Sequence, residues 1–401
     1  MLTETSRRLR LASVPNGSQK DKERRRPGEV RDAIMKVLSS RPDGASISEI
    51  THHVRQLMGD ATSSSIRSYL RLNSESLFRR ENRGIYSLRE SPDLYASASL
   101  PHSAFRMWES GNVKLIEADC FEWLRQRDHN SIHGVVMDPP YGLVEYEPEE
   151  QEKLRNGRGG VWRIPPEFDG TKRSPVPRFT VLSPRDIDDL GVFFFNWGRT
   201  VLPALVPGAN VVVASNPLLS YVVSGALARA GLERRGEIVR LVMTMRGGDR
   251  PKAAHHEFQG VSVMPRSMWE PWLVFRKPIE GRVQDNLRKW KTGGFRRPSG
   301  AQPFGDVISS SPTHKSEREL APHPSLKPQR FLRELVRGIL PLGEGIVLDP
   351  FAGSGSTLAA AEAVGYASIG IEKDPHYFEL AINAIPKLVA YKNLKNYEFD
   401  L

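Results

Sequence analysis

From about residue 105, short runs rich in β-branched residues alternate with longer stretches of helical pattern. Residues 132–137, 209–214, 345–348 and 367–371 are four such runs. Because parallel strands are connected through helices that cover both faces of their sheet, this alternation predicts an α/β fold with a mainly parallel sheet. Ligands of such sheets bind beyond the carboxyl ends of the strands, so the residues that follow each run are the first candidates for a functional site.

The composition is that of a chain that can bury a core. Of 401 residues, 39% are hydrophobic and 26% are charged, and at roughly 100–200 residues per domain the length predicts two or three domains. No apolar run approaches the ~18 residues of a membrane helix, and residues 1–15 lack an apolar signal core. The single cysteine, Cys120, excludes an internal disulfide and a cysteine-rich zinc site. We expect a cytoplasmic, nucleoid-associated protein.

The net charge indicates a polyanionic partner. Lys and Arg number 57 against 47 Asp and Glu, which gives a formal net charge of +10. Nucleic acid is the commonest partner of such basic chains. A basic surface that serves only solubility is the alternative.

Residues 28–90 are predicted to form a small helical unit that ends in a hairpin. Apolar residues at helical spacing indicate three short helices, and Ser46 and Glu49 form a capping box at the start of the second. Residues 78–88 have the pattern of strand, turn and strand. Three helices followed by a hairpin are typical of a winged helix, a small α+β domain.

The third helix of this unit is the one that would enter a major groove. Arg67 and Arg71 lie on its predicted outward face, and Arg83 at the hairpin turn would reach the DNA backbone. The alternative is a winged helix that docks another protein. A basic, disordered tail is predicted before this unit, over residues 1–27, and a linker after it, over residues 91–104.

Asp138, Pro139, Pro140 and Tyr141 directly follow the predicted strand 132–137. Two consecutive prolines fix the backbone and leave carbonyl oxygens free to accept hydrogen bonds, while Asp138 adds a carboxylate that only accepts. Tyr141 supplies a flat ring for stacking. Together they suit a planar heterocycle that carries an exocyclic amino group, and the alternative is a tight turn with a buried tyrosine.

A glycine-rich turn between a predicted strand and a helix extends from Asp349 to Thr357. Gly353 and Gly355 permit close approach of the backbone to a ligand, and the helix start favours an anion. The lysine of a triphosphate-binding loop is missing, and Leu358 stands where a dinucleotide-binding motif has its third glycine. This favours a nucleoside that carries a carboxylate.

Two further segments contribute polar groups. Glu372 follows the run 367–371, where an acid accepts hydrogen bonds from ribose hydroxyls, although a surface glutamate is the alternative. Residues 323–328, His-Pro-Ser-Leu-Lys-Pro, hold polar groups between two prolines just before a helix predicted over 329–340. Taken alone, residues 323–328 are an ordinary loop.

Together, these motifs resemble the S-adenosylmethionine-dependent amino methyltransferases of DNA over roughly residues 110–390. The resemblance implies a Rossmann-like methyltransferase domain over 105–401, with helices on both faces of its sheet and a target-recognition insert over about 246–320. Because the catalytic motif precedes the cofactor motif, the order resembles that of the beta group. Asp138 to Tyr141 are similar to the catalytic motif of the family. The cofactor residues that the resemblance implies are Asp119, Cys120, His323, Ser325, Lys327, Asp349, Phe351, Ala352, Gly353, Ser354, Gly355 and Glu372.

An aspartate in the first motif position resembles adenine-specific members more than cytosine-N4 members. The implied reaction flips the base out of the duplex, stacks it on Tyr141 and transfers the methyl group directly to its amino nitrogen. No metal is needed. A cytosine-N4 enzyme, an RNA amino methyltransferase and a non-catalytic DNA-binding regulator are the alternatives, and a cognate restriction endonuclease and a homodimer stay open.

Basic residues interleaved with aromatic ones between the motifs are the predicted DNA contacts of the catalytic domain, and residues 246–250 are a second, weaker candidate. A solvated basic loop is the alternative. These predicted contacts are Arg288, Lys289, Trp290, Lys291, Arg296 and Arg297.

Overall fold

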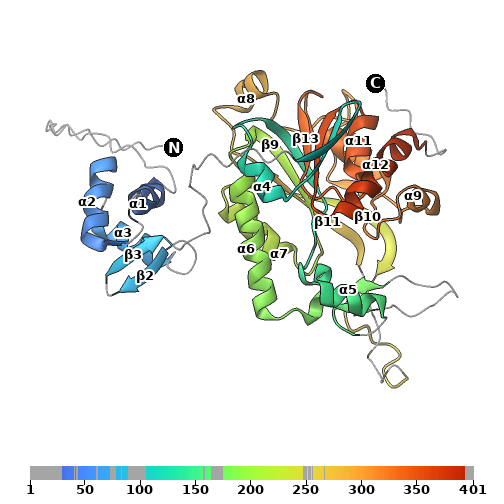
Figure 1. The fold of residues 1–401 in the computed structure, drawn as a ribbon, viewed down its shortest axis with the longest axis horizontal. Coiled ribbons are helices and arrows are strands. Elements are labelled where there is room, and N and C mark those ends of the chain that lie inside the picture. The colour runs from blue at the N-terminus through green and yellow to red at the C-terminus, as the bar shows by residue number, and fades with distance from the viewer. Residues whose placement is uncertain are drawn as a thin grey trace, which may run out of the picture. The chain divides into compact units, whose positions relative to one another are not determined.

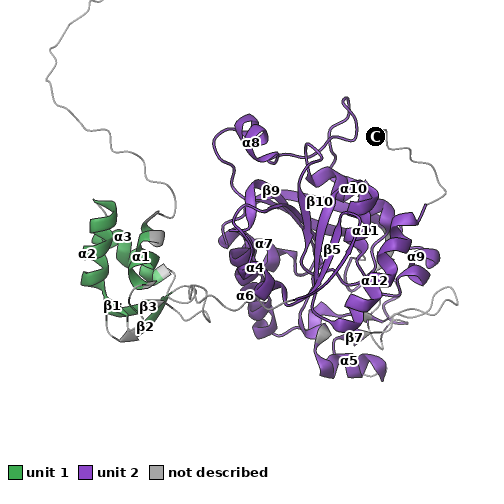
Figure 2. Cartoon of the chain, turned by 45° about the horizontal axis from the view of Figure 1, so that its top comes forward, with its two compact units in different colours: residues 1–102 green, residues 103–401 purple. Residues whose placement is uncertain are grey.

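The chain divides into two compact units, residues 1–102 and residues 103–401 (Figure 2). The predicted tail 1–27, the linker 91–104, Arg83 and residues 247–250 lie outside the described residues. None of the helices in the described residues is long and apolar enough to cross a membrane. The computed structural model describes residues 29–39, 41, 44–59, 62–72, 78–82, 84–88, 105–156, 159–163, 175–246, 251, 254, 256–265 and 267–392.

The first unit contains the helices and the hairpin that its sequence predicts. The capping box forms as expected, because the Glu49 amide donates to Ser46 Oγ at 3.3 Å and the Ser46 amide donates to Glu49 Oε2 at 2.8 Å. Ile34, Ile50 and Ile66 from the three helices are fully buried together. The winged-helix interpretation and its DNA contacts stay predictions. The elements are α1 (Glu29–Ser39), β1 (Ala45–Ser46), α2 (Ile47–Met58), α3 (Ser63–Leu72), β2 (Phe78–Asn82) and β3 (Ile85–Leu88).

Within the described residues of the second unit, nine strands form one mixed sheet in the order β12-β10-β11-β9-β6-β13-β14-β5-β4. The five strands from β9 to β5 are parallel, as the alternating pattern predicts. β4 and the long β10–β11 hairpin add antiparallel pairs at the two sides. The strands are β4 (Arg106–Ser110), β5 (Val113–Glu117), β6 (Ile132–Met137), β9 (Leu205–Ala214), β10 (Glu233–Arg246), β11 (Ser267–Arg276), β12 (Val307–Ser309), β13 (Ile346–Asp349) and β14 (Ala367–Glu372).

Helices cover both faces of this sheet (Figure 1). In β9 the side chains of Val211 and Val213 pack into the core on one face, and those of Val212 and Ala214 into the core on the other. A strand that is buried on both faces has an almost continuous apolar sequence, as β9 does. The covering helices are α4 (Cys120–Arg125), α6 (Pro184–Val201) and α7 (Ser220–Arg229) on one face, and α10 (Gln329–Ile339), α11 (Ser356–Ala363) and α12 (Pro375–Ala390) on the other.

Residues 145–178 and 246–320, two long segments between strands of the sheet, contain regular structure of their own. Residues 145–178 include α5 (Pro148–Arg155), which starts with proline at its first position, carries acids in its first turn and bases in its last. Residues 246–320, the predicted target-recognition insert, include β11, which lies between β9 and β10 in the sheet, and the recognition role of the segment stays a prediction. The other elements in or beside these two segments are η1 (Val144–Tyr146), β7 (Trp162–Arg163), β8 (Val176–Pro177), η2 (Phe179–Val181), α8 (Val283–Trp290) and α9 (Lys315–Leu320).

Candidate active site

The strand register brings the separate motifs to one edge of the sheet. Leu348 of β13 lies opposite Val135 of β6, so the chain leaves both strands side by side, toward Asp138 and Phe351. β14 and β5 end at the same edge, where Glu372 is the register partner of Glu117. The predicted convergence of the 138–141 and 349–357 segments is therefore confirmed.

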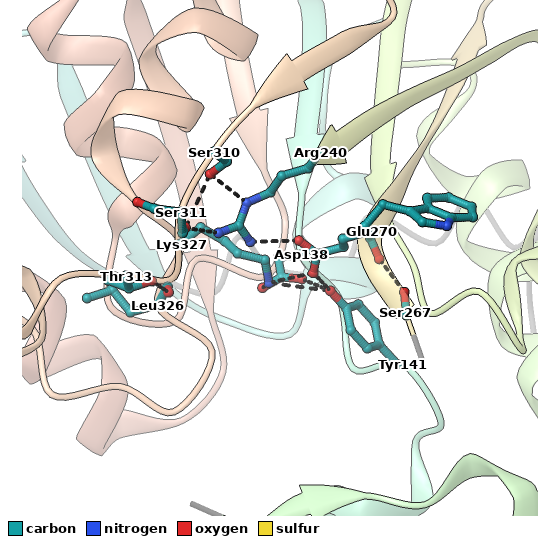
Figure 3. Close-up of polar contacts among 11 residues, drawn as sticks. Asp138, Tyr141, Arg240, Ser267, Glu270, Ser310, Ser311, Thr313, Leu326 and Lys327 are labelled. Carbon is teal, nitrogen blue, oxygen red and sulfur yellow. Dashed lines mark hydrogen bonds and ion pairs between the residues drawn. The ribbon is translucent and has the colours of Figure 1, made fainter. Parts of the chain in front are cut away.

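Asp138 lies at the centre of a buried polar cluster (Figure 3). Its Oδ1 accepts a hydrogen bond from the Tyr141 hydroxyl at 2.7 Å, and its Oδ2 accepts one from Lys327 Nζ. Only 17% of the Asp138 side chain and 10% of the Lys327 side chain are exposed. Lys327 belongs to the 323–328 segment, so that segment reaches the catalytic motif.

Glu270 and Arg240 complete this cluster, and sequence reasoning missed both. Glu270 Oε1 lies 3.4 Å from Lys327 Nζ and 2.8 Å from the Tyr141 hydroxyl oxygen, while its Oε2 accepts from Arg240 Nη1 at 2.8 Å. Glu270 lies within an apolar run, Trp269 to Phe275, and a single acid in such a run is the sequence signal that could have found it.

Burial and neighbouring charges set the protonation of this cluster. Burial raises the pKa of Asp138, although the Lys327 ammonium group opposes the shift. Burial alone would raise the pKa of Glu270 as well, but Lys327 and Arg240 hold it below its usual value. Burial and the Asp138 charge raise the pKa of Tyr141 well above its ordinary value, so its hydroxyl stays a donor. Two carboxylates and two cations thus balance each other.

The glycine-rich turn contains backbone conformations that only glycine adopts easily. Gly353 and Gly355 have φ values of +52° and +76°, and a Cβ on Gly355 would collide with the side chain of Ile385. The Gly353 amide donates to Glu372 Oε2 at 2.7 Å, which ties the turn to the end of β14. α11 starts at Gly355 without a side-chain cap, so its first amides stay available to a ligand. Buried Asp349 accepts from the Phe351 amide at 3.1 Å.

His323 links the glycine-rich turn to the catalytic cluster. A Cβ on Gly353 would come within 3.2 Å of His323 Nε2, while Lys327, four residues further on, contacts Asp138. His323 Nδ1 accepts from the Ser325 amide at 3.2 Å, which assigns the ring proton to Nε2. Burial lowers the pKa of His323 to about 4, so the ring is neutral at pH 7.

Known proteins are similar to this chain in sequence. The N6/N4 methyltransferase model, described as DNA methylase, matches residues 244–383. The Type II methyltransferase M2.DpnII of Streptococcus pneumoniae is 36% identical over 274 residues, which cover 68% of this chain and 90% of that protein. The chain belongs to the DNA amino methyltransferases.

Two further known proteins are similar to this chain. The Type II methyltransferase M2.LlaDCHI of Lactococcus lactis subsp. cremoris is 34% identical over 284 residues, which cover 71% of this chain and 93% of that protein. Among solved structures, the M1.HpyAVI–SAM complex is 16% identical, with a TM-score of 0.39, and is matched over 69% of this chain and 99% of that chain.

S-adenosylmethionine is the cofactor that the amino methyltransferase family implies, and the carboxyl edge has groups that suit it. The half-buried Glu372 carboxylate faces the turn and accepts from the Gly353 and Asp374 amides, at 2.7 and 2.8 Å. Carboxylate lone pairs that remain there suit ribose hydroxyls, and the uncapped start of α11 suits a carboxylate. Ala352 and Ser354 of the same turn are buried.

Asp119 and Cys120 have structural partners of their own. Asp119 caps α4 by accepting from the Phe121 amide at 2.9 Å, and its other oxygen accepts from Lys373 Nζ at 3.1 Å. Burial raises the pKa of Cys120 to about 12, so its thiol is not a nucleophile at neutral pH.

The predicted DNA contacts of residues 282–297 lie at the other edge of the sheet. Asn286 of α8 donates to the Pro207 carbonyl near the amino end of β9, and Arg296 Nη1 donates to the Tyr366 hydroxyl just before β14, at 3.0 and 2.8 Å. Figure 1 shows α8 at the opposite end of the unit from α5, which follows the catalytic motif. The structure does not bring this segment to Asp138. DNA contacts therefore stay a prediction, at a distance from Asp138, for six of its residues: Arg288, Lys289, Trp290, Lys291, Arg296 and Arg297.

Proposed function

We propose that this DNA amino methyltransferase transfers a methyl group to the N6 amino group of adenine in duplex DNA. The observation that carries the proposal is the Asp138 carboxylate, held by Tyr141 and Lys327 at the edge that it shares with the glycine-rich turn. The family resemblance of an aspartate at this motif position supports adenine over cytosine.

The catalytic motif then has separate tasks for each residue. The target base is flipped out of the duplex, because its amino group cannot be reached in the stack. The Asp138 carboxylate and the Pro139 carbonyl accept the two amino hydrogens, Pro140 keeps the turn rigid, and the Tyr141 ring stacks on the base. Holding both hydrogens aims the nitrogen lone pair at the methyl group. The nitrogen loses a proton only after it gains the methyl, so Asp138 need not be a strong base.

The residues of the neighbouring turn hold the cofactor in this proposal. When bound, S-adenosylmethionine supplies an electrophilic methyl group on its sulfonium. Glu372 would accept from the ribose hydroxyls, the amides at the uncapped start of α11 would hold the carboxylate, and Asp119 would serve the adenine end, as the family resemblance implies. His323, Ser325 and Lys327 border the methionine end.

We also assign the first unit a role in DNA binding. α3 exposes Ser64, Arg67, Ser68 and Arg71 at helical spacing on one face, and this face carries no acid. Such a face suits the phosphates and base edges of a major groove. Replacing Arg67 and Arg71 with alanine should weaken DNA affinity and leave cofactor affinity unchanged. The number of phosphate contacts inferred from the salt dependence of the DNA affinity should fall by about two. Unchanged DNA affinity would favour protein docking.

The proposed reaction is tested with methyl-labelled S-adenosylmethionine and duplex DNA of mixed sequence. Digestion of the DNA to nucleosides and mass spectrometry should show labelled N6-methyl-2′-deoxyadenosine. Label on the cytosine amino group alone would contradict the proposed substrate, and label that prefers RNA in a competition would contradict duplex DNA. The absence of transfer to any nucleic acid would favour a regulator that keeps only the fold.

A further inference from the structure

Asp138 is already occupied by two donors. The Tyr141 hydroxyl donates to one of its oxygens, and the Lys327 ammonium group donates to the other. A neutral amino group that arrives at Asp138 has to compete with a charged donor, and charge-assisted hydrogen bonds are the stronger ones. Asp138 keeps lone pairs for a further donor, but the ammonium group offsets the charge of the carboxylate, so Asp138 orients a target amino group more strongly once Lys327 has another acceptor.

Glu270 is that second acceptor. Its Oε1 lies 3.4 Å from Lys327 Nζ and 2.8 Å from the Tyr141 hydroxyl oxygen, which is itself 2.7 Å from Asp138 Oδ1. A tyrosine hydroxyl has a single hydrogen and donates it to one carboxylate at a time. The cluster thus supports two arrangements, with the donors on Asp138 or on Glu270 (Figure 3).

Arg240 fixes Glu270 in this position. The two residues are register partners on β10 and β11, and only 3% and 9% of the Arg240 and Glu270 side chains are exposed. Arg240 also donates from Nε to Ser310 Oγ at 3.1 Å and from Nη2 to the Ser311 carbonyl at 2.9 Å. With Oε2 held by Arg240, Oε1 stays directed at Tyr141 and Lys327. Burying a charge pair is costly, so such a pair is weak evidence for stability and calls for another role.

A second ion pair in the same hairpin, which lies away from the site, provides a comparison with the Arg240–Glu270 pair. Glu233 and Arg276 are also register partners across β10 and β11, at the other end of the hairpin, and Arg276 Nη2 lies 2.6 Å from Glu233 Oε2. The Glu233 side chain is 38% exposed, and the contacts of its carboxylate are with Arg276. Glu270 differs because its second oxygen faces two residues of the catalytic cluster.

We propose that Glu270 is a positioning residue that takes over Lys327 and the Tyr141 hydroxyl when a target amino group binds, and so frees the Asp138 carboxylate. This inference rests on the proposed function, because it needs an amino group that approaches Asp138. The exchange breaks and forms only hydrogen bonds, and no proton leaves its oxygen or nitrogen.

The test replaces Glu270 with glutamine, which keeps the shape and an oxygen for Arg240 but removes the charge that attracts Lys327. With cofactor and DNA saturating, Glu270→Gln should lower kcat on the order of ten- to a hundredfold, because Lys327 stays on Asp138. The dissociation constant for S-adenosylmethionine should stay unchanged, which also reports an intact fold. Glu233→Gln, the same substitution at the other end of the hairpin, is the matched control and should keep the wild-type kcat. A kcat of Glu270→Gln within twofold of the wild-type value would overturn the inference.

A double variant separates positioning from a merely structural role. In Glu270→Gln with Lys327→Gln, no ammonium group competes for Asp138, and the remaining charges of Asp138 and Arg240 balance. The double variant should therefore be faster than Glu270→Gln alone at saturating cofactor. A double variant as slow as Glu270→Gln, or slower, would overturn the inference. A wild-type chain that transfers no label to DNA would overturn the proposed function, and this inference with it.

Discussion

The two edges of the central sheet carry their charged residues in different ways. At the carboxyl edge, four charged residues from four segments contact one another and are largely buried: Asp138, Arg240, Glu270 and Lys327. At the amino edge, several basic residues of 282–297 bind surface acids or backbone carbonyls, as Lys289 does with Glu280 and Arg297 with Gly300. The site therefore lies where distant charges are buried together, and not where basic residues are most concentrated along the chain.

The physical reason is the cost of removing charge from water. A buried ion persists only with a partner, so a cluster such as Asp138 and Lys327 needs all its members in place. An exposed pair such as Arg288 with Asp285 contributes little, because water and salt screen it. Substitutions should thus have large effects at the carboxyl edge and small ones at the amino edge.

The largest expected effect is that of Asp138→Ala. Loss of the carboxylate that orients the amino group should lower kcat by on the order of 10²–10³-fold. Lys327 keeps Glu270 as a partner, so the fold and S-adenosylmethionine affinity should be retained. Methyl-label incorporation into DNA and calorimetric cofactor titration measure the two effects. Near-normal turnover would show that Asp138 does not accept the target hydrogens.

An intermediate effect is expected from alanine at two glycines with similar backbones. Gly355 at the carboxyl edge and Gly365 at the amino edge have φ of +76° and +79°, so alanine costs about 1–2 kcal/mol of folding free energy at either. At Gly355 the new Cβ also meets Ile385, whereas at Gly365 no heavy atom lies within 4 Å. This collision should cost roughly a further 1–3 kcal/mol and weaken cofactor binding.

Urea unfolding and cofactor titration of the two variants provide the measurement. Equal losses of stability at the two positions, with cofactor affinity unchanged in both, would contradict the tight packing of the glycine-rich turn.

The smallest effect is expected at the amino edge. Replacing Arg288 and Lys289 with alanine removes two exposed cations that pair with Asp285 and Glu280. The kcat at saturating DNA should change by less than about twofold, since exposed pairs are worth little. Steady-state methylation against DNA concentration separates kcat from KM. A hundredfold loss of kcat would place these residues at the target base and would contradict the proposed difference between the two edges of the sheet.

The sequence predicted the local parts of the site and missed the parts that depend on register. Asp138 and Gly353 follow strands whose apolar runs are visible in the chain, so their meeting at one edge follows from a parallel sheet. Glu270 and Arg240 reach the site only because β10 and β11 pair with this particular register, and β11 lies in the segment 246–320, for which no strand of the sheet was predicted. Basic residues near 288 are conspicuous in the sequence, but composition does not say at which edge a segment lies.

The most direct test of the account is a crystal structure of the chain with S-adenosylhomocysteine and duplex DNA. We expect the thioether sulfur beside the 351–355 turn and an extrahelical adenine on Tyr141, with its amino group within hydrogen-bond distance of Asp138. Lys327 should then contact Glu270. A cofactor product bound away from this turn, or a target base at the α8 edge of the sheet, would contradict the account.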